Sequence, residues 1–276
     1  GEVISPKKTI KKEKASGAYG PIFLKKVLTP TKEMIMIDYS DSGDGKKTAR
    51  ALNKFLFADQ HMKELANRTD LNTIILDKTN VEGHGLAYIA DLPVEELNLG
   101  STPVNDAGLV WISKMPKLKT LHLSHCPMMT DAGIAKLSGL PLVYLDLRAT
   151  NLGNQSLKAI GEIKPLKTLT IDRVFKIDAV GIRYSKTIPK LDNLGVSSDD
   201  KTREFFIALN EVNPKILGLK GTKPIPADCF SQLKNIQDLA FSGAILDDKN
   251  LNCFTSGFNK LNTLYLENTG ISDSQI

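Results

Sequence analysis

Long apolar runs are missing from this chain of 276 residues, so the sequence contains no candidate for a membrane span, which needs about 18–20 consecutive apolar residues. Cysteine is scarce. The three cysteines, at positions 126, 229 and 253, form no CxxC pair, which argues against a disulfide framework and a zinc site. The four histidines show no metal-ligand spacing, and we expect neither a metal nor a cofactor. Hydrophobic residues nevertheless make up 41% of the chain, enough for a sizeable folded core.

Excess positive charge is also missing from most of the chain. The formal net charge is +5, and residues 1–26, with seven lysines and two glutamates, account for all of it. We interpret residues 1–30 as a basic, flexible tail, and an arm that binds nucleic acid or an anionic surface is the alternative.

A phrase of two apolar residues separated by one position recurs through three quarters of the sequence. The pairs come at intervals of 22–25 residues and number nine: Ile74/Leu76, Leu97/Leu99, Leu121/Leu123, Leu145/Leu147, Leu169/Ile171, Leu194/Val196, Leu217/Leu219, Leu239/Phe241 and Leu264/Leu266. A nearly constant period of this length indicates a repeat architecture, in which each unit buries its apolar edge against its neighbours. We therefore predict that residues 71–276 form about nine repeats, the last of them incomplete.

Each unit is predicted to contain a short strand, a turn and a helix. The paired apolar residues of the strand point inward, and the residues beside them point outward. Helix signals follow the turn, as in "TDAGIAKLSGL" at 130–140, where Thr130 or Asp131 is the candidate N-cap. Because strands stack at about 4.8 Å and helices are about 10 Å across, the array should curve, with a parallel sheet on its concave face.

A small side chain stands three positions after the second apolar residue of most units. We expect these side chains to be buried and to bond the backbone of the turn: Thr79, Thr102, Cys126, Thr150, Thr222 and Thr269, with Ala244 in one unit. Cys126 is therefore predicted to be a free, buried thiol that fills the same slot as Thr150 in the next unit.

The repeated phrase, L-x-x-L-x-L-x-x-(C/T)-x-x-(I/M)-T-D-A-G-(L/I), resembles the leucine-rich repeat family, and 118–137 fits it best. Cysteine or threonine at the slot, followed by "DAGL", is most similar to the cysteine-containing subclass and its bacterial members. The resemblance implies an α/β solenoid shaped as a curved horseshoe, with helices on the convex face, that recognises proteins and carries no catalytic residues. It leaves two locations open, an exported bacterial protein whose signal peptide has been removed or a cytoplasmic protein.

Residues 31–70 are predicted to cap the first repeat. "MIMIDY" at 34–39 is a candidate strand, and 46–66 is a candidate helix with one apolar face formed by Leu52, Phe55, Leu56, Met62 and Leu65. At the other end, "TGISDSQI" begins another unit and stops, so we expect either that the native chain continues or that its last edge pairs with a partner.

Three short motifs are rejected. In "SDSGDGKKT" at 40–48, Ser40 stands where a phosphate-binding loop needs its first Gly, and Lys47 where it needs Ser or Thr. A calcium loop beginning at Ser40 would lack its final Glu. "LPVEEL" at 92–97 is similar to the opening of an F-box, but it lies in repeat phase, with Leu97 as an inward strand residue.

The outward strand positions form the predicted binding surface, and they hold six acidic and two basic side chains. The candidate partner-binding residues are His122, Ser124, Tyr144, Asp146, Arg148, Thr170, Asp172 and Tyr265. Tyr and Arg are enriched at binding hot spots. Because nucleic-acid recognition needs a basic face, we expect the repeat domain to bind a neutral or basic protein or peptide and no nucleic acid.

The predicted function is a non-catalytic scaffold that binds a protein or peptide on its concave face. The first alternative is the recognition domain of a larger signalling or adaptor protein, F-box-like or kinase-linked. A hydrolytic enzyme is more distant: His122, Ser124 and Asp146 fall on neighbouring strands, but nothing supplies a closed pocket or an oxyanion site. As an outward residue, Asp146 is expected to be exposed, so that its replacement by alanine changes stability by less than about 0.5 kcal/mol.

Overall fold

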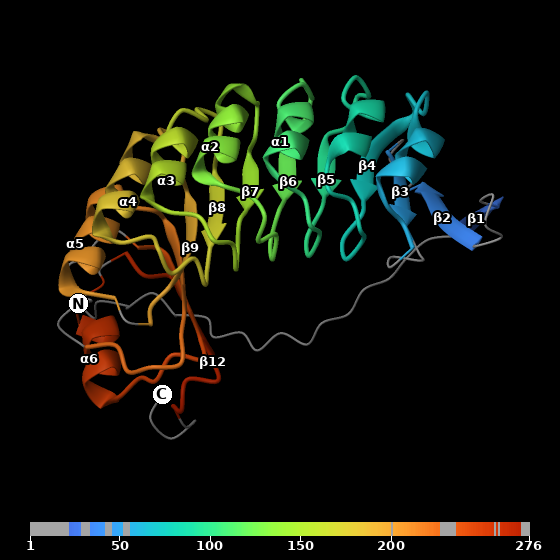
Figure 1. The fold of residues 1–276 in the computed structure, drawn as a ribbon. Coiled ribbons are helices and arrows are strands. Elements are labelled where there is room, and N and C mark those ends of the chain that lie inside the picture. The colour runs from blue at the N-terminus through green and yellow to red at the C-terminus, as the bar shows by residue number, and fades with distance from the viewer. Residues whose placement is uncertain are drawn as a thin grey trace, which may run out of the picture.

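The computed structural model describes residues 22–28, 34–41, 46–51, 56–199, 201–226, 236–256, 258 and 260–271. Within this part of the chain, twelve strands form one sheet in which neighbours in sequence are neighbours in space, from β1 to β12. Figure 1 shows that the sheet bends into an arc and that the helices lie along its outer side. The predicted horseshoe, with a concave sheet and convex helices, is confirmed.

Nine strands contain the predicted apolar pairs or their first residues. They are β4 (Leu71–Ile75), β5 (Glu96–Asn98), β6 (Thr120–His122), β7 (Tyr144–Asp146), β8 (Thr168–Ile171), β9 (Asn193–Ser197), β10 (Ile216–Lys220), β11 (Asp238–Ser242) and β12 (Thr263–Glu267). All nine pair in parallel, and the register aligns equivalent residues, as where Leu121 lies between Leu97 and Leu145. The inward residues of β4–β11 are buried, whereas Leu264 and Leu266 of β12 are only partly buried.

The convex side carries one helical segment in most repeats. The α-helices are α1 (Asp106–Ile112), α2 (Asp131–Ile134), α3 (Asn154–Ile160), α4 (Ala179–Tyr184), α5 (Arg203–Val212) and α6 (Asp248–Ser256), and the 3₁₀ segments are η1 (Asp59–Leu65), η2 (His84–Tyr88), η3 (Ala135–Gly139) and η4 (Ser185–Thr187). Thr130 is the N-cap of α2, where its side chain accepts a hydrogen bond from the N–H of Gly133. No helix of the described residues is long and apolar enough to cross a bilayer.

Carboxylates at the start of one helix bind the start of the next. Asp106 accepts hydrogen bonds from the backbone N–H of Thr130, at 2.8 Å, and from its hydroxyl, at 2.6 Å. Asp131 in turn accepts from the N–H of Gly153, at 2.8 Å, and from the hydroxyl of Ser156. Asp131 is therefore not the cap of its own helix: it joins two repeats, and so does Asp106.

The buried slot is confirmed in four consecutive units. The hydroxyls of Thr79, Thr102 and Thr150 each donate to the carbonyl three residues earlier, at 2.7 Å. Cys126 is a fully buried free thiol whose Sγ lies 3.1 Å from the carbonyl oxygen of Leu99. The expectation for Thr222 is wrong, because this residue is exposed and bonds Asp199 instead. Positions 229 and 253 have no described side chains.

The predicted helix at 46–66 is wrong. Residues Lys47–Ala51 form strand β3, which lies between β2 (Met34–Asp41) and β4. In β3, buried Ala49 and Ala51 alternate with more exposed residues, the period of a strand, and the backbone completes the sheet. Among the described residues of this range only η1 is helical, and it buries Met62 and Leu65 as expected, whereas Leu56 is 36% exposed. Leu52 and Phe55 lie outside the described residues.

The predicted flexible tail, residues 1–30, contains a strand. Ile22–Leu28 forms β1, which pairs antiparallel with β2 from Ile22 opposite Ser40 to Leu28 opposite Met34. The strand predicted at 34–39 is confirmed as the middle of this antiparallel segment. Residues 1–21 and 29–30, which hold most of the tail, lie outside the described residues. The division into tail, cap and repeats stays a prediction.

Replacing Leu145 by alanine should lower the free energy of unfolding by about 2–5 kcal/mol, the usual cost of emptying a buried leucine site. Leu145 is fully buried in the central strand β7. The matched control is Lys158→Ala on the exposed side of α3, which should change stability by less than about 0.5 kcal/mol. Urea denaturation measures both, and equal losses would contradict the assignment of inward residues.

Replacing Cys126 by threonine should change the free energy of unfolding by less than about 1.5 kcal/mol, because a threonine fills the same slot in both neighbouring repeats. Cys126→Leu, which adds volume to a closed site, should cost more, about 1–3 kcal/mol. Thermal unfolding distinguishes the two variants, and a large loss for Cys126→Thr would show that the slot differs between repeats.

Candidate functional site

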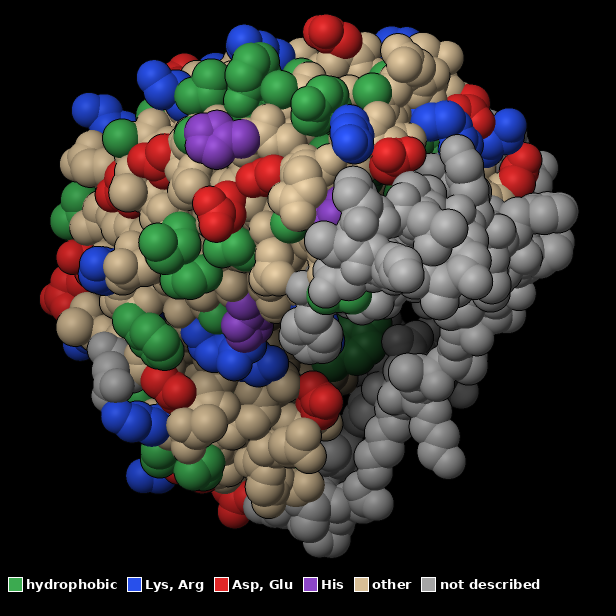
Figure 2. Space-filling view, turned by 45° about the vertical axis from the view of Figure 1, so that its right-hand side comes forward, with side chains coloured by type: hydrophobic (Ala, Val, Ile, Leu, Met, Phe, Trp, Pro, Cys, Tyr) green, Lys and Arg blue, Asp and Glu red, His purple; other side chains and the backbone are tan. Residues whose placement is uncertain are grey.

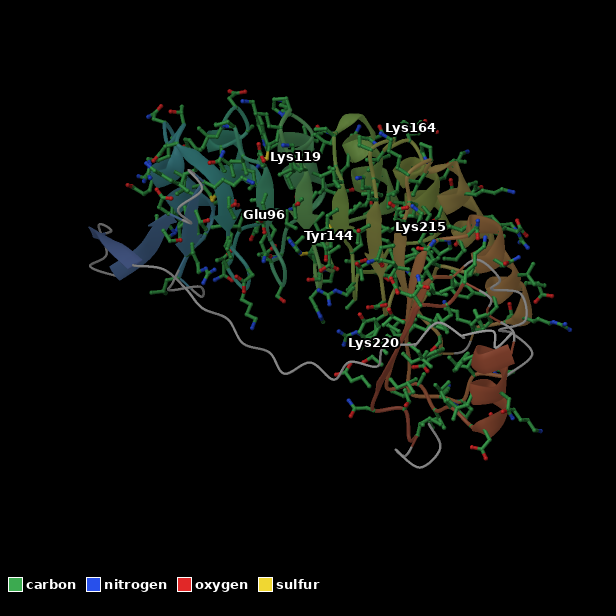
Figure 3. All side chains as sticks on the ribbon, turned by 180° about the vertical axis from the view of Figure 1, so that it is seen from behind. Glu96, Lys119, Tyr144, Lys164, Lys215 and Lys220 are labelled. Atoms are coloured by element: carbon green, nitrogen blue, oxygen red, sulfur yellow. The ribbon has the colours of Figure 1, made fainter. Side chains whose placement is uncertain are left out.

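The concave face is the surface of strands β4–β12, because the outward side chains of a solenoid sheet point into the space that the arc encloses. Figure 3 shows this face with Glu96 and Tyr144 on the middle strands and Lys220 farther along the arc, near the last strands. Two regions of the face differ in character: a polar cluster in the middle and a hollow over β8–β12.

The cluster is built on Asp146, at the end of β7. Its Oδ1 accepts hydrogen bonds from the backbone N–H of Arg148, at 3.0 Å, and from Arg148 Nε, at 2.9 Å. Its Oδ2 accepts from Arg148 Nη2 at 2.7 Å, which completes a bidentate pair. The side chain of Asp146 is only 1% exposed, whereas that of Arg148 is 43% exposed. The expectation of an exposed Asp146 is therefore wrong, since the arginine folds back over the carboxylate.

His122 and Tyr144 complete the cluster. His122 Nδ1 lies 3.8 Å from Asp146 Oδ2, and its Nε2 lies 3.8 Å from Oε1 of Glu96 on β5. The ring of Tyr144 packs against the imidazole, with centroids 4.9 Å apart. The cluster thus offers a partly exposed tyrosine, histidine and arginine that are held in place by a buried carboxylate.

Charge in the cluster is balanced from within. Burial alone would raise the pKa of Asp146, but His122 and Arg148 outweigh it, so the pKa of this carboxyl lies well below its usual range. Burial and the nearby charge of Asp146 raise the pKa of the Tyr144 phenol. The buried carboxylate is thus ionised and fully paired.

The hollow has a volume of about 780 Å³ and lies over the five strands β8–β12. Its floor consists of Gly195, Gly218 and Ala240, which are aligned across β9, β10 and β11. Thr170 and Asp172 line the β8 side of the hollow, and Tyr265 and Glu267 line the β12 side, with Lys220 also in the lining. A row of three small residues therefore leaves the backbone of the sheet accessible between two polar walls.

Asp172 differs from Asp146 in place and in pairing: Asp146 ends strand β7 and aligns with Thr170 of β8, whereas Asp172 follows β8. Its side chain accepts no hydrogen bond from any described residue, and it is half-buried. Burial raises the pKa of Asp172, and the negative charge of Asp146 raises it further. The positive charges of Lys220, Arg148 and Arg173 act in the opposite direction, but the pKa stays above its usual value. Asp172 is thus a partly desolvated carboxylate without a donor in the wall of an open hollow.

The predicted site residues fall into two groups. His122, Tyr144, Asp146 and Arg148 come together in the cluster, whereas Thr170, Asp172 and Tyr265 line the hollow. Ser124 is half-buried after β6, and its hydroxyl forms no hydrogen bond with a described residue. Whether any of them contacts a partner stays a prediction.

The floor of the hollow was not among the predicted site residues. Gly195, Gly218 and Ala240 occupy the middle outward position of three consecutive strands, and that succession of small residues was visible in the sequence. A Cβ added to Gly218 would meet only the Cα of Gly195, at 3.8 Å. The position therefore has room for a side chain, and its lack of one keeps the hollow open.

Charges elsewhere on the molecule are mixed. On the side seen in Figure 2, acidic and basic side chains alternate over short distances, and no large field of one sign forms on the coloured surface. The described ranges contain no group of three or more His, Cys, Asp or Glu side chains that could hold a metal ion.

Comparisons with known proteins agree with the repeat architecture. Residues 114–138 match a family model described as "Leucine Rich repeat", and this segment is the unit that fits the sequence phrase best. A search of curated proteins found no match.

One solved structure shows the same fold at low identity, and two others are similar with lower TM-scores. An internalin (inlF) of Listeria monocytogenes is similar over 76% of this chain and 58% of its own, with 15% identity and a TM-score of 0.52. An internalin C2 (inlC2) of the same bacterium covers 79% of this chain and 80% of its own, with 17% identity and a TM-score of 0.44. The plant peptide hormone receptor RGFR1, in complex with RGF2, is similar over 84% of this chain and 37% of its own, with 19% identity and a TM-score of 0.44. The chain is a leucine-rich repeat solenoid that spans about 58% of the length of the first of these proteins.

Replacing Asp146 by alanine should lower the free energy of unfolding by about 2–3 kcal/mol, because charge-assisted hydrogen bonds to Arg148 are lost. Asp172→Ala is the matched control. It removes a carboxylate that has no donor among the described residues, and it should not lower stability. Equal losses in urea denaturation would contradict the distinction between the two aspartates.

The effect of Asp146 should depend on pH. Its pKa is lowered in the folded state, so its stabilisation is complete above the unfolded-state pKa of about 3.9 and is lost as the pH falls toward the folded-state value. The stability difference between the unmodified protein and Asp146→Asn should therefore shrink as the pH is lowered from about 5 to 3. A difference that grows over this range would contradict the assignment.

Proposed function

We propose that the concave face of the array binds an extended segment of a protein or peptide and carries out no chemistry. The observation that carries this proposal is the hollow of about 780 Å³, which leaves the surface of three strands uncovered between polar walls. A concave surface with a few convergent polar groups is the default candidate for a binding site. The cluster around Tyr144 and Arg148 offers the residue types that contribute most at protein interfaces and lies on the same face.

The charge of the face favours a neutral or basic partner. Arg148 is taken up by Asp146, so Lys220 is the remaining outward cation, against Glu96, Asp172, Asp238 and Glu267 among the acids. An acidic face attracts a basic segment and repels phosphates. We infer that the repeat domain does not bind nucleic acid, and any such binding would belong to the lysines of residues 1–26.

The alternatives receive less support. A hydrolytic site of serine, histidine and aspartate needs a hydrogen bond between the nucleophile and the base. The hydroxyl of Ser124 has no hydrogen bond with His122, and Asp146 is committed to Arg148. A recognition domain of a larger adaptor or signalling protein would use the same concave face, so that alternative changes the context of the binding and not its place.

We also propose that the repeats belong to the cysteine-containing type, in its bacterial form with threonine at the slot. The support is the slot itself, which holds Cys126 between Thr102 and Thr150 in three successive units, all buried. The thiol and the Thr102 hydroxyl are 3.6 Å apart, so the two residue types occupy one continuous column.

A test of the binding face starts from peptides of about 12 residues selected from a random display library on the full chain. Tyr265→Ala, on the concave face, should weaken a selected peptide by at least tenfold, because aromatic side chains dominate interface energies. Tyr88→Ala is the matched control, since Tyr88 is similarly exposed but lies in η2 on the convex side. Fluorescence anisotropy measures both, and selected peptides that depend on Tyr88 and not on Tyr265 would contradict the proposal.

A further inference from the structure

The hollow has the dimensions of a seat for one extended chain. Its walls, on β8 and β12, are separated by four strand spacings, or about 19 Å. An extended peptide with its side chains is narrower than this, and in the middle row of β9–β11 no side chain is larger than that of Ala240. Asn193, Lys220 and Ser242 line the hollow on either side of that row. A ligand backbone can therefore approach the sheet closely over Gly195 and Gly218.

One wall of the hollow carries a carboxylate that has no hydrogen-bond donor among the described residues. The carboxylate of Asp172 has lost part of its hydration, and none of the described residues donates to it. Three cations act on it only through space: Lys220 in the same lining, Arg148, which is bound by Asp146, and Arg173, whose Nη2 lies 3.2 Å from Nε2 of His125. A partly desolvated carboxylate is stabilised by a charged donor that replaces the lost hydration, and such hydrogen bonds are among the strong ones.

We propose that the hollow over β8–β12 is the ligand seat of the concave face, and that it takes an extended peptide segment with an arginine or lysine side chain paired with Asp172. This inference rests on the proposed function and specifies its place and its ligand. An arginine fits best, because its planar guanidinium binds both oxygens of a carboxylate, as Arg148 does with Asp146 one repeat away.

The opposite wall fixes the rest of the segment. Tyr265 of β12 is 37% exposed and presents its ring to the hollow, where an apolar or cationic side chain of the peptide can pack on it. Glu267 lies in the same wall, so both sides of the seat carry a carboxylate. Among the described lining residues Lys220 is the single cation, and with two acids present the hollow favours a basic segment over an acidic one.

The test uses 12-residue peptides selected from a random library on the full chain, measured by fluorescence anisotropy. The selected sequences should be enriched in arginine or lysine, and Asp172→Asn should weaken them at least tenfold. Asp192→Asn is the charge-matched control: Asp192 pairs with Lys215, 2.8 Å away, just before β9 and outside the lining of the hollow, and its replacement should leave binding unchanged.

A second pair of variants tests the place by shape alone. Gly218→Leu fills the floor at a position with room for a Cβ and should abolish binding, while the melting temperature stays unchanged. Gly139→Leu is its control, because a Cβ there also meets nothing within 4 Å and the residue lies in η3, away from the hollow.

Each outcome decides between the inference and the proposed function. Peptides that need Tyr265 but tolerate both Asp172→Asn and Gly218→Leu would overturn the ligand seat and leave concave-face binding standing. Peptides that are insensitive to all three would overturn both. If Asp172→Asn unfolds the protein, the aspartate has a structural partner and the inference is wrong, since a carboxylate without a donor is not needed for folding.

Discussion

Backbone hydrogen bonds between successive repeats are the constraint on which the whole molecule depends. The carbonyl of Glu95 accepts from the N–H groups of both Lys119 and Thr120, and the carbonyl of Lys119 accepts from Val143 and Tyr144 in the same way. One strand and one helix cannot bury their apolar faces alone, so each repeat needs both neighbours to fold. The thiol of Cys126, which reaches the carbonyl of Leu99, and the carboxylates of Asp106 and Asp131 extend the same linkage to the turns and helices.

This linkage separates structural side chains from those available for binding. Inward residues and slot residues are buried and pack the repeats together. Most outward residues of the sheet therefore contribute little to the core. Asp146 is an exception, because it is buried and holds Arg148. Asp172, one repeat farther on, keeps its carboxylate unpaired beside a floor of small residues. The concave face thus combines an internally paired region with one whose carboxylate has no donor among the described residues, and the second is the region that we propose for the ligand.

The sequence predicted what the repeat period dictates. The strands, their inward residues and the thiol of Cys126 follow from a spacing of 22–25 residues that every unit must obey. The strand Lys47–Ala51 escaped prediction because its alternation spans only five residues and the helical spacing of Met62 and Leu65 follows closely. The burial of Asp146 was not predicted, because the pleat of a strand fixes the direction of a side chain but does not show that Arg148 covers it. The hollow corresponds to three small residues at the middle outward positions of β9–β11. It was not predicted, because the candidate binding residues were chosen among polar and aromatic side chains and not for the absence of a side chain.

The most direct measurement is a crystal structure of the full chain with a selected peptide. We expect the peptide to lie between the walls on β8 and β12, over Gly195 and Gly218, with a basic side chain at hydrogen-bonding distance from Asp172. A peptide bound along the convex helices, or at an edge of the array with the hollow left open, would contradict it.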